Sequence, residues 1–153
     1  MAYEQRRGQF TISTERSRLD LNVIHSFLTK SYWAAGVPME VVKRSVENSL
    51  PFGLYENDRQ IGFARVVTDY ATFAYLADVF VLEAHRGSGL GKWLVAVVDS
   101  HPELKGLRRW MLATRDAHEL YRTVGFEILK QPDRWMEKHN PGVYDEERAA
   151  INS

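Results

Sequence analysis

The sequence predicts a mixed α/β domain in which a mixed central β-sheet has helices on both faces. The early strand candidates follow one another through short turns, as in hairpins, whereas helical segments separate the later ones, as in crossovers. A length of 153 residues, with 44% hydrophobic and 26% charged residues, suits one hydrophobic core. No linker-like or repeated stretch interrupts the chain, so we expect a single domain over residues 1–153, with residues 139–153 as a tail.

The N-terminal part of the chain predicts one short strand and two helices. Gln9–Ser13 is the strand candidate. Apolar residues then recur at helical spacing, at Leu21, Ile24, Phe27 and Leu28. Either Asp20 or Ser17 provides the N-cap of this helix. After a turn-like break over residues 34–38, we expect a second short helix to begin near Met39.

From Phe52 onward the pattern changes to that of β-strands. Phe52–Tyr55 and Ile61–Thr68 are rich in β-branched and aromatic residues, and they predict a hairpin around a turn at residues 56–58. Asp69–Tyr70 predicts the next turn, and Thr72–Leu82 predicts a central strand. This region therefore supplies the middle of the sheet.

The second half of the chain predicts helices between strands. Gly89 begins an amphipathic helix that ends at His101–Pro102. Arg109–Thr114 is the next strand candidate. Asp116 is expected to cap a short helix that runs through Tyr121.

Two short strands are expected beyond that helix. Gly125 ends the helix, and the apolar and aromatic residues of Phe126–Leu129 and Trp135–Glu137 predict the strands. The last dozen residues, 142–153, predict a weakly held tail or helix.

The composition excludes several classes of function. Lys plus Arg and Asp plus Glu each number 20, so the overall charge gives no reason to expect a nucleic acid as partner. The absence of Cys excludes disulfides, thiolate nucleophiles and Cys-based metal sites. His85, His118 and Glu119 lack the spacing of a zinc motif, so no metal is expected.

The chain also lacks an apolar run near the roughly 20 residues that span a bilayer, and its start lacks the apolar region of a secretory signal. We therefore expect a soluble cytoplasmic protein without a membrane partner. The sequence leaves open whether the protein forms a homodimer.

A glycine-rich segment between a strand and a helix predicts a phosphate-binding site. It consists of Arg86, Gly87, Ser88, Gly89, Leu90, Gly91 and Lys92. Free backbone N–H groups at a helix N-terminus, together with the helix dipole, favour a negatively charged ligand. Glycine lets the phosphate approach these N–H groups and permits a positive φ. The segment matches neither the GxxxxGK[ST] nor the GxGxxG pattern.

The pattern R-x-x-G-x-G instead resembles the acetyl-CoA pyrophosphate loop of the Gcn5-related N-acetyltransferase (GNAT) superfamily. A second stretch strengthens the resemblance, because it follows the A-x-x-L-Y-x-x-x-G-F motif of that family. Its matching residues are Ala117, Leu120, Tyr121, Gly125 and Phe126. The resemblance implies a three-layer GNAT-type fold and acetyl-CoA as cofactor. It is specific over residues 76–126. Glu83 and Thr114 depart from the proline and asparagine common in the family.

The resemblance also implies how the cofactor is held. The strand that contains Phe80 and Val81 splays away from the next strand at a bulge, and backbone groups of these two residues pair with the pantetheine arm like an added strand. Backbone N–H groups there polarise the acetyl carbonyl. The glycine-rich segment binds the pyrophosphate.

Two residues are candidates for catalysis. The resemblance gives Tyr121 the role of general acid that protonates the departing thiolate. Asp78 interrupts an apolar strand, which makes it a candidate general base, and a structural ion pair with Arg65 is the equally weighted alternative. Glu83 and Asp69 are alternative bases.

The acceptor site is less defined. The candidates are Tyr32, Trp33, Asp69 and Tyr75. Aromatic residues at helix junctions and in hairpins also fill cores, and the sequence leaves that alternative open. Residues 99–101 are of the three types found in a hydrolase triad, but triad residues come together in space and are not contiguous in sequence. We therefore interpret them as the end of a helix.

These observations predict an acetyl-CoA-dependent N-acetyltransferase. It would transfer acetyl to a primary amine of a small molecule or peptide by direct attack in a ternary complex. The alternative is a non-catalytic acyl-CoA-binding sensor or interaction module. Amine-dependent release of thiol from acetyl-CoA separates the two hypotheses.

Overall fold

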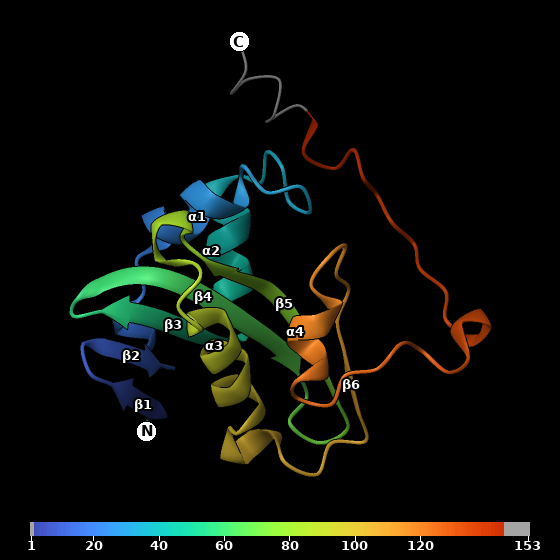
Figure 1. Cartoon of the computed structure of the whole chain (residues 1–153). Coiled ribbons are helices and arrows are strands. Elements are labelled where there is room, and N and C mark those ends of the chain that lie inside the picture. The colour runs from blue at the N-terminus through green and yellow to red at the C-terminus, as the bar shows by residue number, and fades with distance from the viewer. Residues whose placement is uncertain (1, 146–153) are drawn as a thin grey trace.

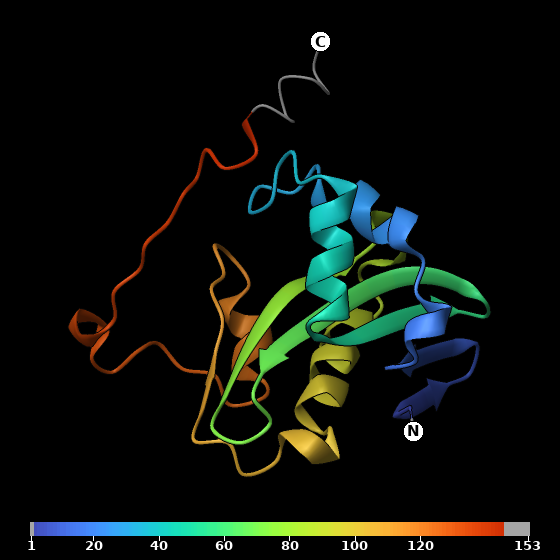
Figure 2. The same cartoon turned by 180° about the vertical axis from the view of Figure 1, so that it is seen from behind.

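The computed structural model describes residues 2–145 and contains a six-stranded sheet whose strands lie side by side in chain order, β1 to β6. The first five strands are antiparallel to their neighbours, and β5 and β6 are parallel. Helices α1 and α2 cover one face, and α3 and α4 cover the other (Figures 1 and 2). The predicted mixed sheet with helices on both faces is therefore confirmed.

The strands are β1 Glu4–Arg7, β2 Phe10–Ser13, β3 Leu50–Glu56, β4 Arg59–Thr68, β5 Phe73–Val81 and β6 Arg109–Met111. The α-helices are α1 Leu21–Leu28, α2 Met39–Glu47, α3 Leu90–Asp99 and α4 His118–Arg122. Short 3-10 helices are η1 Arg16–Arg18, η2 Glu83–His85, η3 Pro102–Leu104 and η4 Pro132–Arg134. No helix within residues 2–145 is long and apolar enough to cross a membrane.

Helix α1 begins where its sequence provides a cap. The Asp20 carboxylate accepts hydrogen bonds from the backbone N–H groups of Asn22 (3.0 Å) and Val23 (3.2 Å), which have no partner inside the helix. The buried residues Ile24 and Leu28 lie one turn apart and face the sheet. The predicted helix and one of its two predicted caps are confirmed.

Each face of the sheet has its own hydrophobic cluster. The larger cluster lies under α3 and includes Phe52 and Leu94, whereas the smaller one lies under α1 and α2 and includes Ile24, Phe63 and Phe80. Full burial of one such side chain stabilises the fold by about 1.5–3 kcal/mol. The two clusters hold the sheet between the helical layers.

Strand β5 contains a bulge where it pairs with β4, and its pairing with β6 ends before that bulge. Ala64 of β4 faces two residues of β5, Asp78 and Val79, and Asp78 has a φ of +55°. Strand β6 pairs with β5 only over Phe73–Tyr75. Beyond this point the two strands diverge and leave an opening in the sheet.

Two predictions around β6 are wrong in detail. The strand ends at Met111 and not at Thr114, because β5 has already diverged. Ala117, not Asp116, is the N-cap of α4. The Thr114 hydroxyl accepts a hydrogen bond from the Ala117 N–H over 3.0 Å and so organises the turn into the helix.

The two strands predicted near the C-terminus are also wrong. Residues 126–129 and 135–137 belong to an extended arm that leaves the sheet after α4 (Figure 1). Ile128 is 70% exposed, so its segment has no apolar face to pack against. The arm returns to the α1 side at Tyr144, which packs on the smaller cluster. Residues 146–153 of the predicted tail lie outside the described residues.

One strand was missed altogether. Strand β1 consists only of exposed residues and has no apolar alternation, so its backbone pairing with β2 is its main tie to the sheet. Periodicity cannot detect such an edge strand.

Asp20→Ala should lower the free energy of unfolding by about 1 kcal/mol, because two N–H groups of α1 lose their acceptor. Asp20→Asn is the matched control, since asparagine is an equally good cap and should retain nearly all of the stability. Urea unfolding followed by circular dichroism measures both. An alanine variant as stable as the asparagine variant would contradict the assigned cap.

Candidate functional site

The glycine-rich segment forms a left-handed turn at the start of α3. Gly87 has a φ of +88° and Gly89, the N-cap residue, a φ of +82°, both in the region that favours glycine. The first hydrogen bond of the helix runs from the Trp93 N–H to the Gly89 carbonyl, over 3.1 Å. Among the described residues, no side chain caps this end. The N–H groups of the first turn are therefore available to an anion.

The segment is tied to the end of β5 by an arginine. The Arg86 Nε–H donates to the carbonyl of Val81 over 2.9 Å. The sequence places Arg86 in the predicted phosphate-binding segment. In the structure its Nε–H bonds within the protein and connects this segment to β5. The start of α3 and the end of β5 are thus held in fixed relation.

The backbone of β5 faces the opening at alternate residues. The Leu82 N–H donates to the Ile61 carbonyl over 2.8 Å, so Leu82 faces β4. Phe80 lies two residues earlier and also faces β4, with its carbonyl 2.9 Å from the position of a Cβ on Gly62. The N–H and C=O groups of Val79 and Val81 therefore face the opening.

This orientation differs from what the resemblance implies for Phe80. The backbone of Phe80 is directed to β4 and cannot also pair with a ligand in the opening, whereas that of Val81 faces the ligand side. The Phe80 ring contributes to the other face, where it stacks on Phe27 with ring centroids 4.0 Å apart. Val79 was missed because its direction depends on where the bulge falls.

A cavity of about 620 Å³ lies at the opening. It is lined by residues from β4 and β5, from the helices α1, α2 and α4, from the segment between β6 and α4, from the loop of residues 29–37 and from the C-terminal arm. We call this space the acceptor cavity and the loop the 29–37 loop. The cavity thus brings together parts of the chain that are distant in sequence.

Tyr121 lies in the wall of the acceptor cavity and is only 8% exposed. Burial raises the pKa of its hydroxyl to about 12, with a smaller contribution from Tyr32. Because the raised pKa disfavours the phenolate, Tyr121 keeps its proton at neutral pH. Its hydroxyl is therefore available as a hydrogen-bond donor in this wall.

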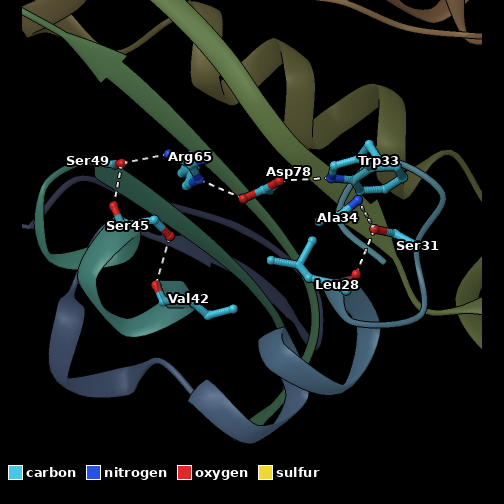
Figure 3. Close-up of polar contacts among 9 residues, drawn as sticks. All are labelled: Leu28, Ser31, Trp33, Ala34, Val42, Ser45, Ser49, Arg65 and Asp78. Carbon is cyan, nitrogen blue, oxygen red and sulfur yellow. Dashed lines mark hydrogen bonds and ion pairs between the residues drawn. The ribbon is translucent and has the colours of Figure 1, made fainter. Parts of the chain in front are cut away.

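Asp78 is held by two partners (Figure 3). One carboxylate oxygen accepts from the Arg65 Nε–H over 2.6 Å, and the other accepts from the Trp33 indole N–H over 2.8 Å. The Asp78 and Arg65 side chains are 9% and 19% exposed. The geometry thus favours the ion pair that was the alternative to a catalytic base.

The ion pair is anchored to α2 through serines. A terminal guanidinium nitrogen of Arg65 donates to the Ser49 hydroxyl over 3.1 Å, and that hydroxyl donates to the Ser45 carbonyl over 2.6 Å (Figure 3). In this chain of hydrogen bonds, Ser45 orients the Ser49 hydroxyl, and that hydroxyl orients the Arg65 guanidinium. Asp78 therefore connects the sheet, α2 and the 29–37 loop.

Three of the four candidate acceptor residues line the acceptor cavity: Tyr32, Trp33 and Tyr75. Asp69 does not line it. Its carboxylate accepts hydrogen bonds from the Ala71, Thr72 and Phe73 N–H groups and from the Thr72 hydroxyl, in the turn between β4 and β5. Those bonds, first of all the backbone bond from Thr72, hold the pKa of Asp69 well below its usual range.

Sequence reasoning missed several lining residues. Arg115 lies in the segment before α4, and Glu137, His139 and Tyr144 come from the arm. Nothing in their local sequence signals a site, because only the path of the chain places them there.

Comparisons with known proteins agree with this geometry. The model of the acetyltransferase (GNAT) domain matches residues 47–128, so the chain belongs to the GNAT family of acetyltransferases. A protein of Gibberella zeae named as an acetyltransferase is 31% identical over 113 residues, which are 61% of this chain and 64% of that relative. The chain therefore spans less than two thirds of that relative's length.

Solved structures show the same fold. A GNAT-family protein from Xanthomonas campestris pv. campestris is 48% identical, with a TM-score of 0.86 over 88% of this chain and 96% of its own. An acetyltransferase from Clostridium acetobutylicum, solved with acetyl-CoA, shares 12% identity and a TM-score of 0.60 over 91% of this chain and 96% of its own. Acetyl transfer from acetyl-CoA is the general reaction of the family.

Gly89→Ala should weaken coenzyme A binding by about tenfold or more, measured by calorimetry. A methyl group at this left-handed position either stands beside the free N–H groups of α3 or forces the turn to relax and redirects them. Gly106→Ala is the matched control, because Gly106 also has a positive φ, of +78°, and open space around it. Equal dissociation constants for the two variants would refute the assigned anion site.

Proposed function

We propose that the protein is an acetyl-CoA-dependent N-acetyltransferase that acts on a primary amine of a small molecule or peptide, by direct attack in a ternary complex. The observation that carries this proposal is the acceptor cavity, which joins the opening between β5 and β6 to Tyr121 and to an aromatic wall. Membership of the GNAT family supports the same reaction.

The residues of the opening fit coenzyme A. The uncapped start of α3 with its left-handed glycines suits a diphosphate. The outward-facing backbone groups of Val79 and the N–H group of Val81 suit the amides of a pantetheine arm. In this proposal residues 86–92 hold the diphosphate. Bound acetyl-CoA would supply an acetyl group activated as a thioester.

Backbone N–H groups of β5 stabilise the developing charge in this proposal. When an amine adds to a carbonyl, negative charge grows on the oxygen, and fixed N–H donors in a closed site stabilise it without reorganisation. Val79 lines the acceptor cavity and its N–H faces the opening. We assign it this role, which requires no particular side chain.

Tyr121 supplies a proton to the departing sulfur in this proposal. A phenol whose pKa burial raises to about 12 is neutral at the working pH, so the proton is in place when thiolate charge develops. Its location in the wall of the acceptor cavity keeps it close to the reacting groups.

The amine must lose a proton before it attacks, since a lysine-like amine has a pKa of about 10.4. Both oxygens of Asp78 already accept hydrogen bonds from Arg65 and Trp33. We therefore propose that Asp78 positions these two side chains and that water in the open cavity carries the amine proton away.

Release of free thiol from acetyl-CoA, followed with a thiol reagent, tests the proposed function. A panel of primary amines should include at least one that accelerates release by about 10²-fold or more over buffer. The absence of Cys from the chain removes the protein's own background from this assay. Coenzyme A binding without amine-dependent release across the panel would identify an acyl-CoA-binding sensor instead.

Tyr121→Phe should lower kcat by about 10²-fold and leave the dissociation constant of coenzyme A nearly unchanged, because only the proton donor is lost. Steady-state kinetics and calorimetry measure the two quantities.

The pH dependence tests the protonation state that this role requires. Since the pKa of Tyr121 is about 12, the ratio of wild-type to variant kcat should stay constant between about pH 7 and 10. An unchanged kcat in the variant would remove the hydroxyl from the mechanism.

A further inference from the structure

Two neighbouring aromatic residues of the 29–37 loop combine exposure with fixed orientation. Tyr32 is 52% exposed and Trp33 is 42% exposed, although both belong to residue types that usually bury much of their surface. Their rings meet edge to face, with centroids 5.1 Å apart and an interplanar angle of 80°. Both rings line the acceptor cavity.

Trp33 is fixed by the ion pair beneath it. Its indole N–H donates to Asp78, whose other oxygen is held by Arg65 (Figure 3). The ring also lies against Phe27, with centroids 6.2 Å apart. A largely buried charge pair thus determines the direction of an exposed ring.

Tyr32 is fixed from the opposite side of the opening. Its hydroxyl accepts a hydrogen bond from the Arg115 backbone N–H over 3.2 Å, and the Arg115 guanidinium lies 3.9 Å from the centre of its ring. The 29–37 loop therefore bridges β5 and the segment that follows β6.

The loop is also held internally. The Gly36 N–H donates to the Thr29 carbonyl over 2.8 Å, and the Ser31 hydroxyl donates to the Leu28 carbonyl over 2.7 Å while it accepts from the Ala34 N–H over 3.1 Å. Rings that are fixed before binding lose little conformational entropy when a ligand packs on them. The wall is preorganised for a flat ligand.

Much of the remaining wall of the acceptor cavity is apolar or carries charges that are paired. Leu28, Val37, Val42, Leu76 and Val79 contribute apolar side chains. Arg65 pairs with Asp78, and Arg115 pairs with Asp116 over 3.5 Å.

Among the described lining residues, Glu137 is the carboxylate that has no ion-pair partner, because Asp78 pairs with Arg65 and Asp116 with Arg115. A ligand with several positive charges would lack counterions here. A single amine on an apolar body meets no such cost.

We propose that Tyr32 and Trp33 determine acceptor specificity and that they select a primary amine carried on a flat, apolar body. The flat body packs on the Trp33 ring, and the amine is directed toward the opening between β5 and β6. This inference rests on the proposed transferase function and names the acceptor class for the same cavity.

Competing acceptors test this inference, with 2-phenylethylamine as the flat apolar amine and spermidine and lysine as charged alternatives. The wild-type protein should have a kcat/KM for 2-phenylethylamine at least about tenfold above those for the other two. Trp33→Leu should raise the KM for 2-phenylethylamine by about tenfold, remove most of this preference and leave coenzyme A affinity intact. A higher kcat/KM for spermidine or lysine would overturn the inference.

Trp135→Leu is the matched control, because Trp135 is 38% exposed and lies outside the acceptor cavity. It should retain the wild-type preference, and equal behaviour of the two leucine variants would contradict a role for Trp33. If no amine releases thiol, the transferase function fails, and calorimetry of 2-phenylethylamine with the coenzyme A-loaded protein decides the inference. Binding that Trp33→Leu weakens supports it, and no detectable binding refutes it.

Discussion

The site depends on the bulge of Asp78 and Val79 in β5, which follows the point where β5 and β6 stop pairing. A left-handed aspartate costs on the order of 1–2 kcal/mol relative to extended backbone, although short polar side chains tolerate it better than others. The charged bond from the Arg65 guanidinium to the Asp78 carboxylate holds this conformation in place. Because the sheet opens there, the backbone groups of Val79 and the N–H group of Val81 are left for a ligand, while the Val81 carbonyl accepts from Arg86.

One residue thereby serves both sides of the proposed reaction. The bulge that contains Asp78 exposes the backbone of β5, and the Asp78 carboxylate fixes the ring that faces the acceptor. Tyr121 approaches the same cavity from α4, across the opening. In this account the cofactor surface, the acceptor wall and the proton donor are held in register by the bent strand and its ion pair.

The sequence predicted those parts of the fold whose signal lies in nearby residues. The helices at Leu21–Leu28 and Met39–Glu47, the central strands and the turn at Gly89 depend on nearby residues, so periodicity and glycine placement were sufficient. Tyr121 came from a motif. The strand predicted at Phe126–Leu129 depended on a partner edge that is not there, and the exposed β1 had no apolar pattern to reveal it.

The direction in which a backbone N–H or C=O group points was harder to predict from the sequence than the elements themselves. A single extra residue reverses which groups face the ligand, so Phe80 and Val79 exchange roles once the bulge is located. Arg65, the partner of Asp78 in β4, was the alternative that the sequence offered, whereas Trp33 of the 29–37 loop is a partner that only the folded chain reveals.

Amide hydrogen exchange, followed residue by residue by NMR with and without coenzyme A, tests the central claim most directly. The account predicts that added coenzyme A slows exchange at the Val79 and Val81 amides and at residues 90–92, while the Phe80 amide, which faces β4, changes little. Binding of coenzyme A that leaves Val79 and Val81 unprotected, or that protects a different strand, would contradict the account.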